Sequence, residues 1–273
     1  MSQSIFRKFR RGRAATTPRN EVGMARTKQV VLRIKRQSNP REAARWEEFA
    51  LPWRPSLNVI ICLRDIAENP VTRDGKKTTP LSYDSNCLEE VCGSCAMLIN
   101  GKARMACSAL IDQLEQPIRI EPMSKFPVVR DLSVDRQFMF ESLKRVKAWI
   151  PIDGSYDLGE GPRVAPETQE RAYPLSRCIS CGNCLEVCPQ VNEHSDFMGA
   201  AIFSQVRLFN MHPTGGMHAK ERLQAAMGHG GIEDCANAQN CVKACPKEIP
   251  LTESLAEINR QAWKQALLGW LIG

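Results

Sequence analysis

The pattern of hydrophobic and polar positions divides the chain into two parts with different secondary structure. In the first part, apolar positions alternate with polar ones or form short runs between turn residues, which predicts strands. These strands lie at residues 30–35, 46–51, 96–99 and 118–120. Ser56 resembles an N-cap, and the helical spacing after it predicts a helix that ends before Pro70. Asn100-Gly101 predicts a hairpin after the third strand, so we expect a small α+β domain.

The second part of the chain has mostly helical spacing. We expect helices at residues 138–150, 197–209, 219–227 and 252–271. Pro151-Ile152-Asp153-Gly154 should end the first of them, and residues 159–166 form a Gly/Pro-rich loop. One face of the last helix carries Leu255, Ile258, Trp263, Leu267 and Leu271. We favour packing of this face on its own domain over contact with a membrane or a membrane protein, although Trp is common there.

Composition and charge add a basic arm to this picture. The 273 residues, 43% of them hydrophobic and 25% charged, suffice for two globular domains. The net charge of +7 is concentrated in residues 1–28, which hold eight basic side chains and one acid, Glu21. The remainder is neutral overall, which argues against a general nucleic-acid-binding role. We expect a basic flexible arm over 1–27, a first domain over 28–128 and a second over 129–273.

The arm differs from a signal peptide because no apolar core precedes a cleavage site. We favour a tail of slight function, with a transit peptide or sequence upstream of a start at Met24 as alternatives. No segment approaches the roughly 20 apolar residues that span a bilayer. We therefore expect other chains to supply any membrane attachment.

The first cysteine group lies in the predicted α+β domain. Cys87, Cys92 and Cys95 have the spacing C-x4-C-x2-C, and we expect Cys107 on the return strand of the predicted hairpin. Plant-type 2Fe–2S ferredoxins use this spacing, in which three thiolates from one tight loop and a fourth from elsewhere hold the cluster. A structural zinc site would normally use two short cysteine pairs. Disulfides are disfavoured because the chain lacks a secretory signal.

The second cysteine group contains two linked motifs. Cys178, Cys181, Cys184 and Cys188 precede Pro189 in the bacterial ferredoxin spacing C-x2-C-x2-C-x3-C-P. A second run has Cys235, Cys241 and Cys245 before Pro246, but Ala238 stands where another cysteine would complete it. The fourth cysteine of one run serves the cluster of the other. This rule predicts a 4Fe–4S cluster on Cys178, Cys181, Cys184 and Cys245.

The other cluster is then left with Cys188, Cys235 and Cys241. Three thiolates predict a 3Fe–4S cluster. The alternative is a 4Fe–4S cluster with a non-cysteine ligand, although the nearby amides of Asn237, Gln239 and Asn240 are poor ligands for such iron. Zinc knuckles are a further alternative, which the two interlocked runs disfavour. The twelfth cysteine, Cys62, is interpreted as a buried structural thiol.

The order of these motifs resembles the iron–sulfur subunit of succinate dehydrogenase and its relative fumarate reductase. The resemblance runs from about Val30 onward and is carried by NCLEEVCGSCAMLINGKARMACSALIDQL, SRCISCGNCLEVCPQVN and DCANAQNCVKACPKEIPL. It implies an N-terminal β-grasp plant-type 2Fe–2S ferredoxin domain followed by an all-helical bacterial-type ferredoxin domain.

The resemblance also implies partners. A flavoprotein subunit with covalent FAD would oxidise succinate, and electrons would pass through the 2Fe–2S, 4Fe–4S and 3Fe–4S clusters. A membrane anchor, a cytochrome b carrying haem b, would hold the quinone that receives them. No catalytic residue is expected on this chain, because the dicarboxylate site of succinate:quinone oxidoreductase lies on the partner.

Two positions depart from the ubiquinone-reducing members of this family. Those members carry a tryptophan and a histidine at the quinone pocket where this chain has Glu193 and Ala236. The chain thus resembles the menaquinone-reducing branch of Gram-positive bacteria. We expect it on the cytoplasmic side of a bacterial plasma membrane, with the matrix side of the mitochondrial inner membrane as the alternative. Fumarate reductase, a soluble ferredoxin and a zinc-binding module are the alternative functions.

Overall fold

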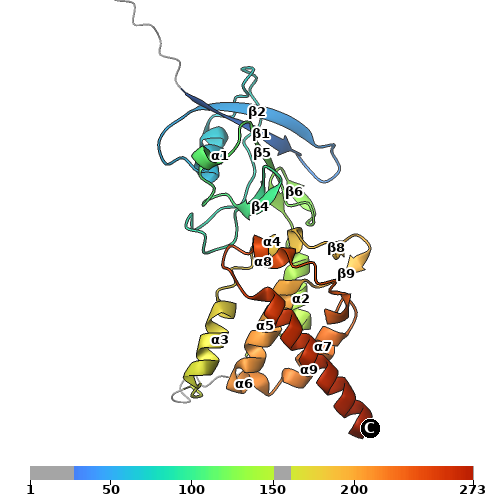
Figure 1. Ribbon diagram of the computed structural model, residues 1–273. Helices are drawn as coiled ribbons and strands as arrows, with labels where there is room; N and C mark the ends of the chain where they lie inside the picture. The colour runs from blue at the N-terminus through green and yellow to red at the C-terminus, as the bar shows by residue number, and fades with distance from the viewer. Residues whose placement is uncertain (1–27, 151–160, 273) are drawn as a thin grey trace, which may run out of the picture.

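The computed structural model describes residues 28–150 and 161–272. Figure 1 shows an elongated molecule with a sheet at one end and helices at the other. The expected basic arm over 1–27, the helix stop at 151–154 and the start of the 159–166 loop lie outside the described residues.

A mixed sheet forms the centre of the first part. Its strands are β1 (Gln29–Arg36), β2 (Arg45–Pro52), β3 (Ala96–Ile99), β4 (Lys102–Met105) and β5 (Ile118–Glu121). They lie in the order β2-β1-β5-β3-β4, with β1 parallel to β5 and the other neighbours antiparallel. Alternate residues of β1 and β5, such as Leu32 and Ile120, are fully buried, as the alternating pattern predicted.

Helix α1 (Val59–Glu68) packs its apolar side onto this core. The expected N-cap at Ser56 is wrong. Asn58 caps the helix by accepting a 2.9 Å bond from the Ile61 N–H, and its amide donates to the Cys107 carbonyl at 2.9 Å. Ser56 has a φ of +62° and turns the chain before the cap. Asn58 therefore joins the start of α1 to the segment of the fourth expected 2Fe–2S ligand.

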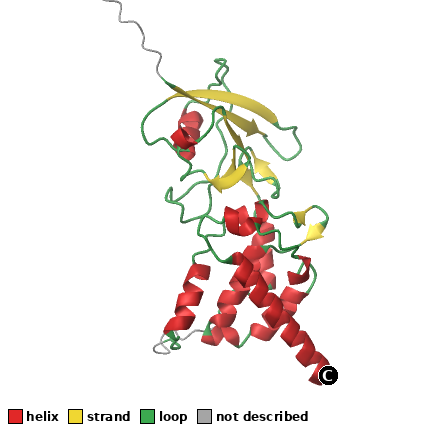
Figure 2. Cartoon of the chain, in the orientation of Figure 1, coloured by secondary structure: helices red, strands yellow, loops and turns green. Residues whose placement is uncertain are grey.

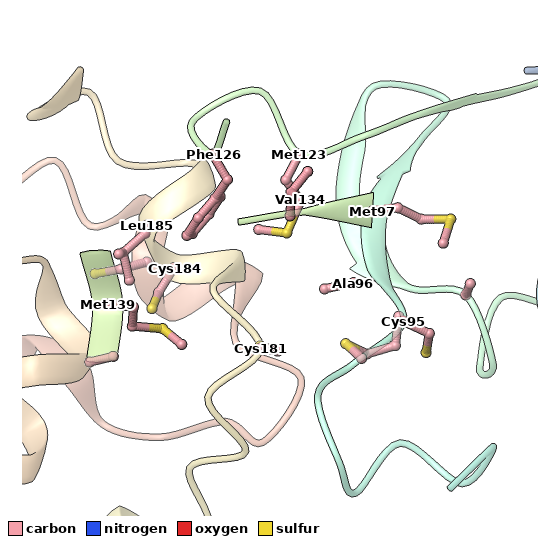
Figure 3. Close-up of a cluster of buried hydrophobic side chains, with 14 of the residues drawn as sticks. Cys95, Ala96, Met97, Met123, Phe126, Val134, Met139, Cys181, Cys184 and Leu185 are labelled. Atoms are coloured by element: carbon pink, nitrogen blue, oxygen red, sulfur yellow. The ribbon is translucent and has the colours of Figure 1, made fainter. Parts of the chain in front are cut away.

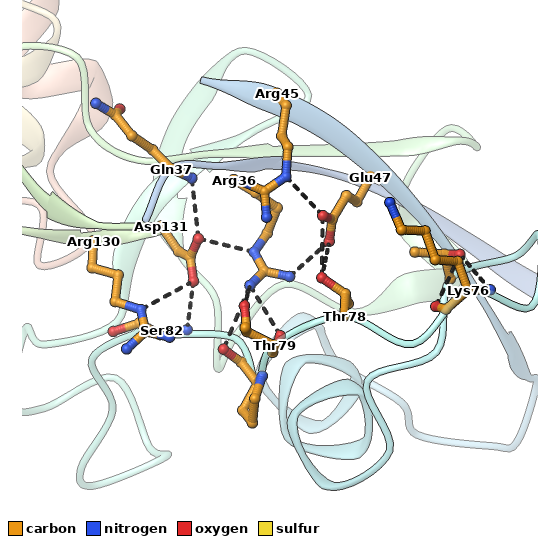
Figure 4. Close-up of polar contacts among 12 residues, drawn as sticks. Arg36, Gln37, Arg45, Glu47, Lys76, Thr78, Thr79, Ser82, Arg130 and Asp131 are labelled. Atoms are coloured by element: carbon orange, nitrogen blue, oxygen red, sulfur yellow. Dashed lines mark hydrogen bonds and ion pairs between the residues drawn. The ribbon is translucent and has the colours of Figure 1, made fainter. Parts of the chain in front are cut away.

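A buried ion-pair network fixes the loops around this sheet (Figure 4). Arg36, only 1% exposed, donates to Asp131 at 2.9 Å, to Glu47 at 2.8 Å and to the Thr79 carbonyl at 3.0 Å. Asp131 also accepts from the Ser82 N–H at 3.0 Å. It stands in the turn of a hairpin, β6 (Val128–Arg130) and β7 (Ser133–Val134), that the pattern did not predict. The network holds the 79–82 loop, which leads to the first cysteine loop.

The second part is mostly helical (Figure 2). Its helices are α2 (Gln137–Arg145), α3 (Pro166–Ser176), α4 (Asn183–Glu186), α5 (Ala200–Met211), α6 (Pro213–Gly216), α7 (Ala219–Met227), α8 (Asn240–Ala244) and α9 (Leu251–Ile272). A short 3-10 turn lies at Ile232–Asp234 in this part, and another lies at Ile111–Gln113 in the first part. A hairpin of β8 (Val191–Asn192) and β9 (Ser195–Asp196) shows that this part is not all-helical.

The expected helix boundaries are partly corrected. Residues 219–227 match α7, whereas α2 ends at Arg145 because Lys147 turns the chain with a φ of +50°. Helix α5 begins at Ala200 rather than at 197, after Gly199 with a φ of +90°. Helix α3 was not predicted, since it buries only Leu175 and shows little amphipathic pattern.

Helix α9 corrects the interpretation of its apolar face. Leu255, Ile258 and Ala262 are buried against the domain. Trp263 and Leu267 are 65% and 55% exposed, so the predicted packing stops there. Figure 1 shows the C-terminal end of α9 running away from the other helices. Among the described helices, α9 included, none combines the length and hydropathy needed to cross a membrane.

Candidate iron–sulfur sites

The first cysteine loop follows the network of Arg36 and leads into β3. Cys87 and Cys92 are partly exposed, whereas Cys95 and Cys107 are buried. The N–H groups of Glu89 and Val91 both point to the Cys87 sulfur, at 3.3 Å. Leu88, Glu90 and Gly93 have positive φ values, so the loop is wound tightly around these sulfurs. Amide donors directed at a thiolate suit a ligand of an electron-rich cluster.

The hairpin between β3 and β4 returns the chain to this loop, as the Asn100-Gly101 signal predicted. The expected place of Cys107 on the return strand is wrong, because β4 ends at Met105 and Cys107 lies in the turn after it. Its thiol is close enough to Cys95 for a hydrogen bond. Burial, followed by the neighbouring thiols of Cys95 and Cys87, raises the pKa of Cys107 to about 12. The structure therefore brings all four cysteines of the first group into one neighbourhood.

The pKa of Cys92, unlike that of Cys107, is lowered. Burial opposes its ionisation, but the N–H of Cys87 and the hydroxyl and N–H of Ser94 stabilise its thiolate. Together they lower the pKa of Cys92 to about 6. The thiolate is the form that binds metal, so this environment prepares Cys92 to bind iron.

A second set of thiols surrounds a cavity at the start of α4. Cys178, Cys181, Cys184 and Cys245 line it together with Met139 from α2 and Leu251 from α9. Ser180 and Gly182, both at positive φ, wind the loop that carries the first three. Burial raises the pKa of Cys181 to about 11, and the charges of Cys178 and Cys245 add to this effect. The fourth sulfur thus comes from the far cysteine run.

A third set lies around a neighbouring cavity. Cys188, Cys235 and Cys241 line it, together with Ala238 and Leu255. Burial raises the pKa of Cys241, and the thiols of Cys188 and Cys235 raise it further. Asn237 and Gln239, at positive φ, wind the backbone around Ala238.

Crowded, buried thiols resist ionisation because their thiolates would repel one another in a low dielectric. Bound iron would remove this penalty, so the residues present fit cluster binding. Within residues 28–150 and 161–272, no three Cys, His, Asp or Glu side chains are grouped tightly enough for a single metal ion. The thiols of the second and third sets surround a cavity instead.

The first and second cysteine loops touch each other. The Gly93 Cα packs against the Ile179 carbonyl, and a Cβ on Gly93 would overlap that oxygen and lie 3.1 Å from the Cys181 Cα. Figure 3 shows Cys95 on one side of this boundary and Cys181 and Cys184 on the other. Gly182 packs on Phe126, whose ring would stand 2.9 Å from an added Cβ.

Three residues at this boundary were missed by the sequence reasoning. Arg136 donates to the carbonyls of Gly93 and Ser94 at 2.8 and 2.7 Å. Glu186 of α4 accepts from the N–H groups of Ser124 and Lys125, each at 3.0 Å. Asn183 is buried, and its amide has no hydrogen-bond partner among the described residues. None belongs to a cysteine motif, so spacing alone could not have found them.

The remaining expected positions lie elsewhere. Cys62 is fully buried in α1, as predicted. Ala236 lines the cavity of Cys188, Cys235 and Cys241, whereas Glu193 lines a separate groove beside the β8–β9 hairpin.

Comparisons with known proteins agree with this division of the chain. Residues 31–141 match the family model of a 2Fe-2S iron-sulfur cluster binding domain, and residues 174–249 match that of a 4Fe-4S dicluster domain. The succinate dehydrogenase iron-sulfur subunit of Bacillus subtilis is 59% identical over 243 residues, which cover 89% of this chain and 96% of that protein. The fumarate reductase iron-sulfur subunit of Wolinella succinogenes is 31% identical over 219 residues, which cover 79% and 89%.

A solved structure supports the fold. A chain of the Mycobacterium smegmatis Sdh1 complex in the apo form superposes with a TM-score of 0.73 at 24% identity, covering 88% of this chain and 97% of that one. The first part is thus a 2Fe–2S domain and the second a 4Fe–4S domain. The chain belongs to the family of iron–sulfur subunits of succinate dehydrogenase and fumarate reductase.

Proposed function

We propose that the chain holds three clusters and transfers electrons in a succinate:quinone oxidoreductase. Cys87, Cys92, Cys95 and Cys107 would hold a 2Fe–2S cluster. Cys178, Cys181, Cys184 and Cys245 would hold a 4Fe–4S cluster, and Cys188, Cys235 and Cys241 a 3Fe–4S cluster. One observation carries the proposal: eleven of the twelve cysteines lie in three neighbourhoods, and the twelfth, Cys62, is buried apart in α1. Two of these neighbourhoods match the exchange of fourth cysteines between the two ferredoxin runs.

We infer domain limits of 28–128 and 129–273, with residues 1–27 as a basic arm, and a β-grasp fold for the first domain. The order β2-β1-β5-β3-β4, with parallel β1 and β5 at its centre, supports this fold. The second domain would be a mostly helical bacterial-type ferredoxin domain. Two loops wound by positive-φ residues, each of which contributes one cysteine to the set of the other, support that description.

When bound, the clusters supply one-electron transfer between a covalent-FAD flavoprotein subunit and quinone. The chain's own residues fix the order of the sites. Gly93 brings the first loop against the second, and α4 joins Cys184 of the second set to Cys188 of the third. The exposed apolar residues Leu88 and Val91 on the first loop support docking of the flavoprotein there. The third set would then face the membrane anchor.

The anchor would be a cytochrome b subunit with haem b, on the cytoplasmic side of a bacterial plasma membrane; a mitochondrial matrix location is the less favoured alternative. We favour menaquinone as the acceptor, because Glu193 and Ala236 lack the aromatic and imidazole groups of the ubiquinone-reducing members. Replacing Glu193 by Gln should leave quinone affinity unchanged within about twofold.

Fumarate reduction, the same reaction reversed, is the second candidate. Its support is the relative from Wolinella succinogenes, but the identity is lower than that of the succinate dehydrogenase relative, 31% against 59%. The two directions are distinguished by assaying the complex with succinate and menaquinone and then with fumarate and menaquinol.

Affinity capture of the tagged full chain from its own organism tests the proposal. We expect a complex that contains a flavoprotein with covalent FAD, haem b and iron, and whose 2Fe–2S signal appears when succinate is added without oxygen. Capture of a colourless chain that carries zinc and no iron would overturn the proposal.

A further inference from the structure

The side chain of Arg136 lies between the first two cysteine loops. It follows β7, directly before α2, and reaches the first loop through a forked pair of bonds. Nη1 donates to the Gly93 carbonyl at 2.8 Å, and Nη2 donates to the Ser94 carbonyl at 2.7 Å. A guanidinium is suited to such a pair because its donors are held in one rigid plane. Arg136 therefore fixes the two peptide groups on either side of Ser94.

The same guanidinium also acts on the second loop. Arg136, Cys92, Ile179 and Ser180 line one groove, so its side chain borders both loops. The guanidinium therefore carries its positive charge beside the loop that leads to Cys181. Its Nε is buried and has no hydrogen-bond partner in the described part of the chain. A buried donor without a partner is costly, which suggests that it serves a group other than the protein.

The contact to Ser94 extends this influence to a thiolate. The Ser94 hydroxyl and N–H both lie within hydrogen-bonding reach of the sulfur of Cys92, which is a proposed 2Fe–2S ligand. Arg136 holds the carbonyl of this same residue. On the other side, Gly93 rests on the Ile179 carbonyl and the Cys181 backbone. One side chain thus positions a ligand of the first cluster and the contact with the second loop.

We propose that Arg136 is a positioning residue that holds the two cluster loops together and whose charge raises the reduction potentials of the 2Fe–2S and 4Fe–4S clusters. This inference rests on the proposed function. A nearby cation favours the reduced form of a cluster, which carries one more negative charge, and cluster potentials respond to local charge. The 3Fe–4S cluster, whose ligands do not contact Arg136, should respond much less.

The test is a redox titration of the purified complex, followed by electron paramagnetic resonance of each cluster. Arg136→Gln keeps a donor but loses the charge, whereas Arg136→Lys keeps the charge but loses the fork. Arg171→Met on α3 is the control, because Arg171 is exposed. We expect Arg136→Gln to make reduction of the 2Fe–2S and 4Fe–4S clusters less favourable by about tenfold in the one-electron equilibrium constant. This corresponds to a fall of about 59 mV in each reduction potential.

Arg136→Lys should leave both potentials close to those of the wild type but alter the magnetic interaction between the two reduced clusters, because the loops are no longer fixed. This measurement decides the question if Arg136→Gln fails to bind iron. Potentials of Arg136→Gln equal to those of the control, or an unchanged interaction in Arg136→Lys, would overturn the inference. Absence of the three clusters from the wild-type complex would instead refute the proposed function.

Discussion

The backbone of Gly93 packs against the carbonyl oxygen of Ile179. This contact joins the loop of the first cysteine group to the loop of the second. Gly93 has a φ of +75°, a conformation that favours glycine, and no room exists for a side chain at this position. The contact is made by backbone on both sides. It therefore depends on the identity of one residue in the C-G-S-C motif.

Gly93→Ala should separate the two loops, since the added methyl would overlap the Ile179 carbonyl. Gly75→Ala is a matched control, because Gly75 has a φ of +81° and nothing within 4 Å of an added Cβ. The control should lose only about 1–2 kcal/mol of folding free energy through backbone strain. We expect Gly93→Ala to lose 2Fe–2S content, measured as iron per chain. Equal iron in both variants would show that the contact is dispensable.

Glu186 should hold the two domains together through the Ser124–Lys125 backbone. Its carboxylate accepts from both N–H groups at 3.0 Å and from the Ser124 hydroxyl at 2.5 Å. Glu186→Ala leaves these donors without an acceptor, which should cost about 1–3 kcal/mol. Thermal unfolding of the complex measures the effect, with Glu170→Ala on the exposed side of α3 as the control. A melting temperature equal to that of the control would contradict this role.

Cys62 should be unreactive in the folded protein. Burial first, and the charge of Asp65 second, raise its pKa from 9.0 to about 12. Between these values the unfolded chain loses the thiol proton and the folded chain keeps it, so the stability that Cys62 contributes falls as the pH rises from about 9 to 12. Iodoacetamide at pH 9 should label Cys62 only after unfolding, as detected by mass spectrometry. Labelling of the native protein at the unfolded rate would refute the burial argument.

Ala238→Cys should convert the three-iron site into a four-iron site. Ala238 lines the cavity of Cys188, Cys235 and Cys241, at the position where a thiolate would complete the second run. The variant should lose the paramagnetic signal of the oxidised 3Fe–4S cluster and gain one iron atom per chain. Ala238→Ser is the matched control and should keep the signal, because a hydroxyl is a poor ligand for such iron. An unchanged signal in Ala238→Cys would place position 238 outside the site.

Spacing indicated which cysteines the fold brings together, because ligands of one cluster restrict the number of residues between them. The cluster that each set would hold stays a prediction. The helix cap and the helix that were not predicted depend on tertiary contacts, which leave no periodic pattern in the sequence. Asn58 replaced Ser56 as the N-cap because its amide also reaches the Cys107 carbonyl. Helix α3 buries only Leu175, so its weak amphipathic pattern could not be recognised.

Arg136 shows the same limit at the candidate site. Its partners are the carbonyls of Gly93 and Ser94, more than forty residues away in the sequence. A backbone carbonyl is present at every residue, so no residue type marks the acceptor. The prediction for Trp263 failed in the opposite sense, since apolar spacing alone could not reveal that the buried apolar positions described for α9 end at Ala262.

Electron paramagnetic resonance of the purified complex, oxidised and then reduced with dithionite, tests the three-cluster assignment most directly when iron is quantified alongside. The account predicts about nine iron atoms per chain, a near-isotropic signal in the oxidised sample, and a 2Fe–2S signal that replaces it on reduction. An oxidised sample without a signal, with zinc or a second four-iron cluster in its place, would contradict the assignment.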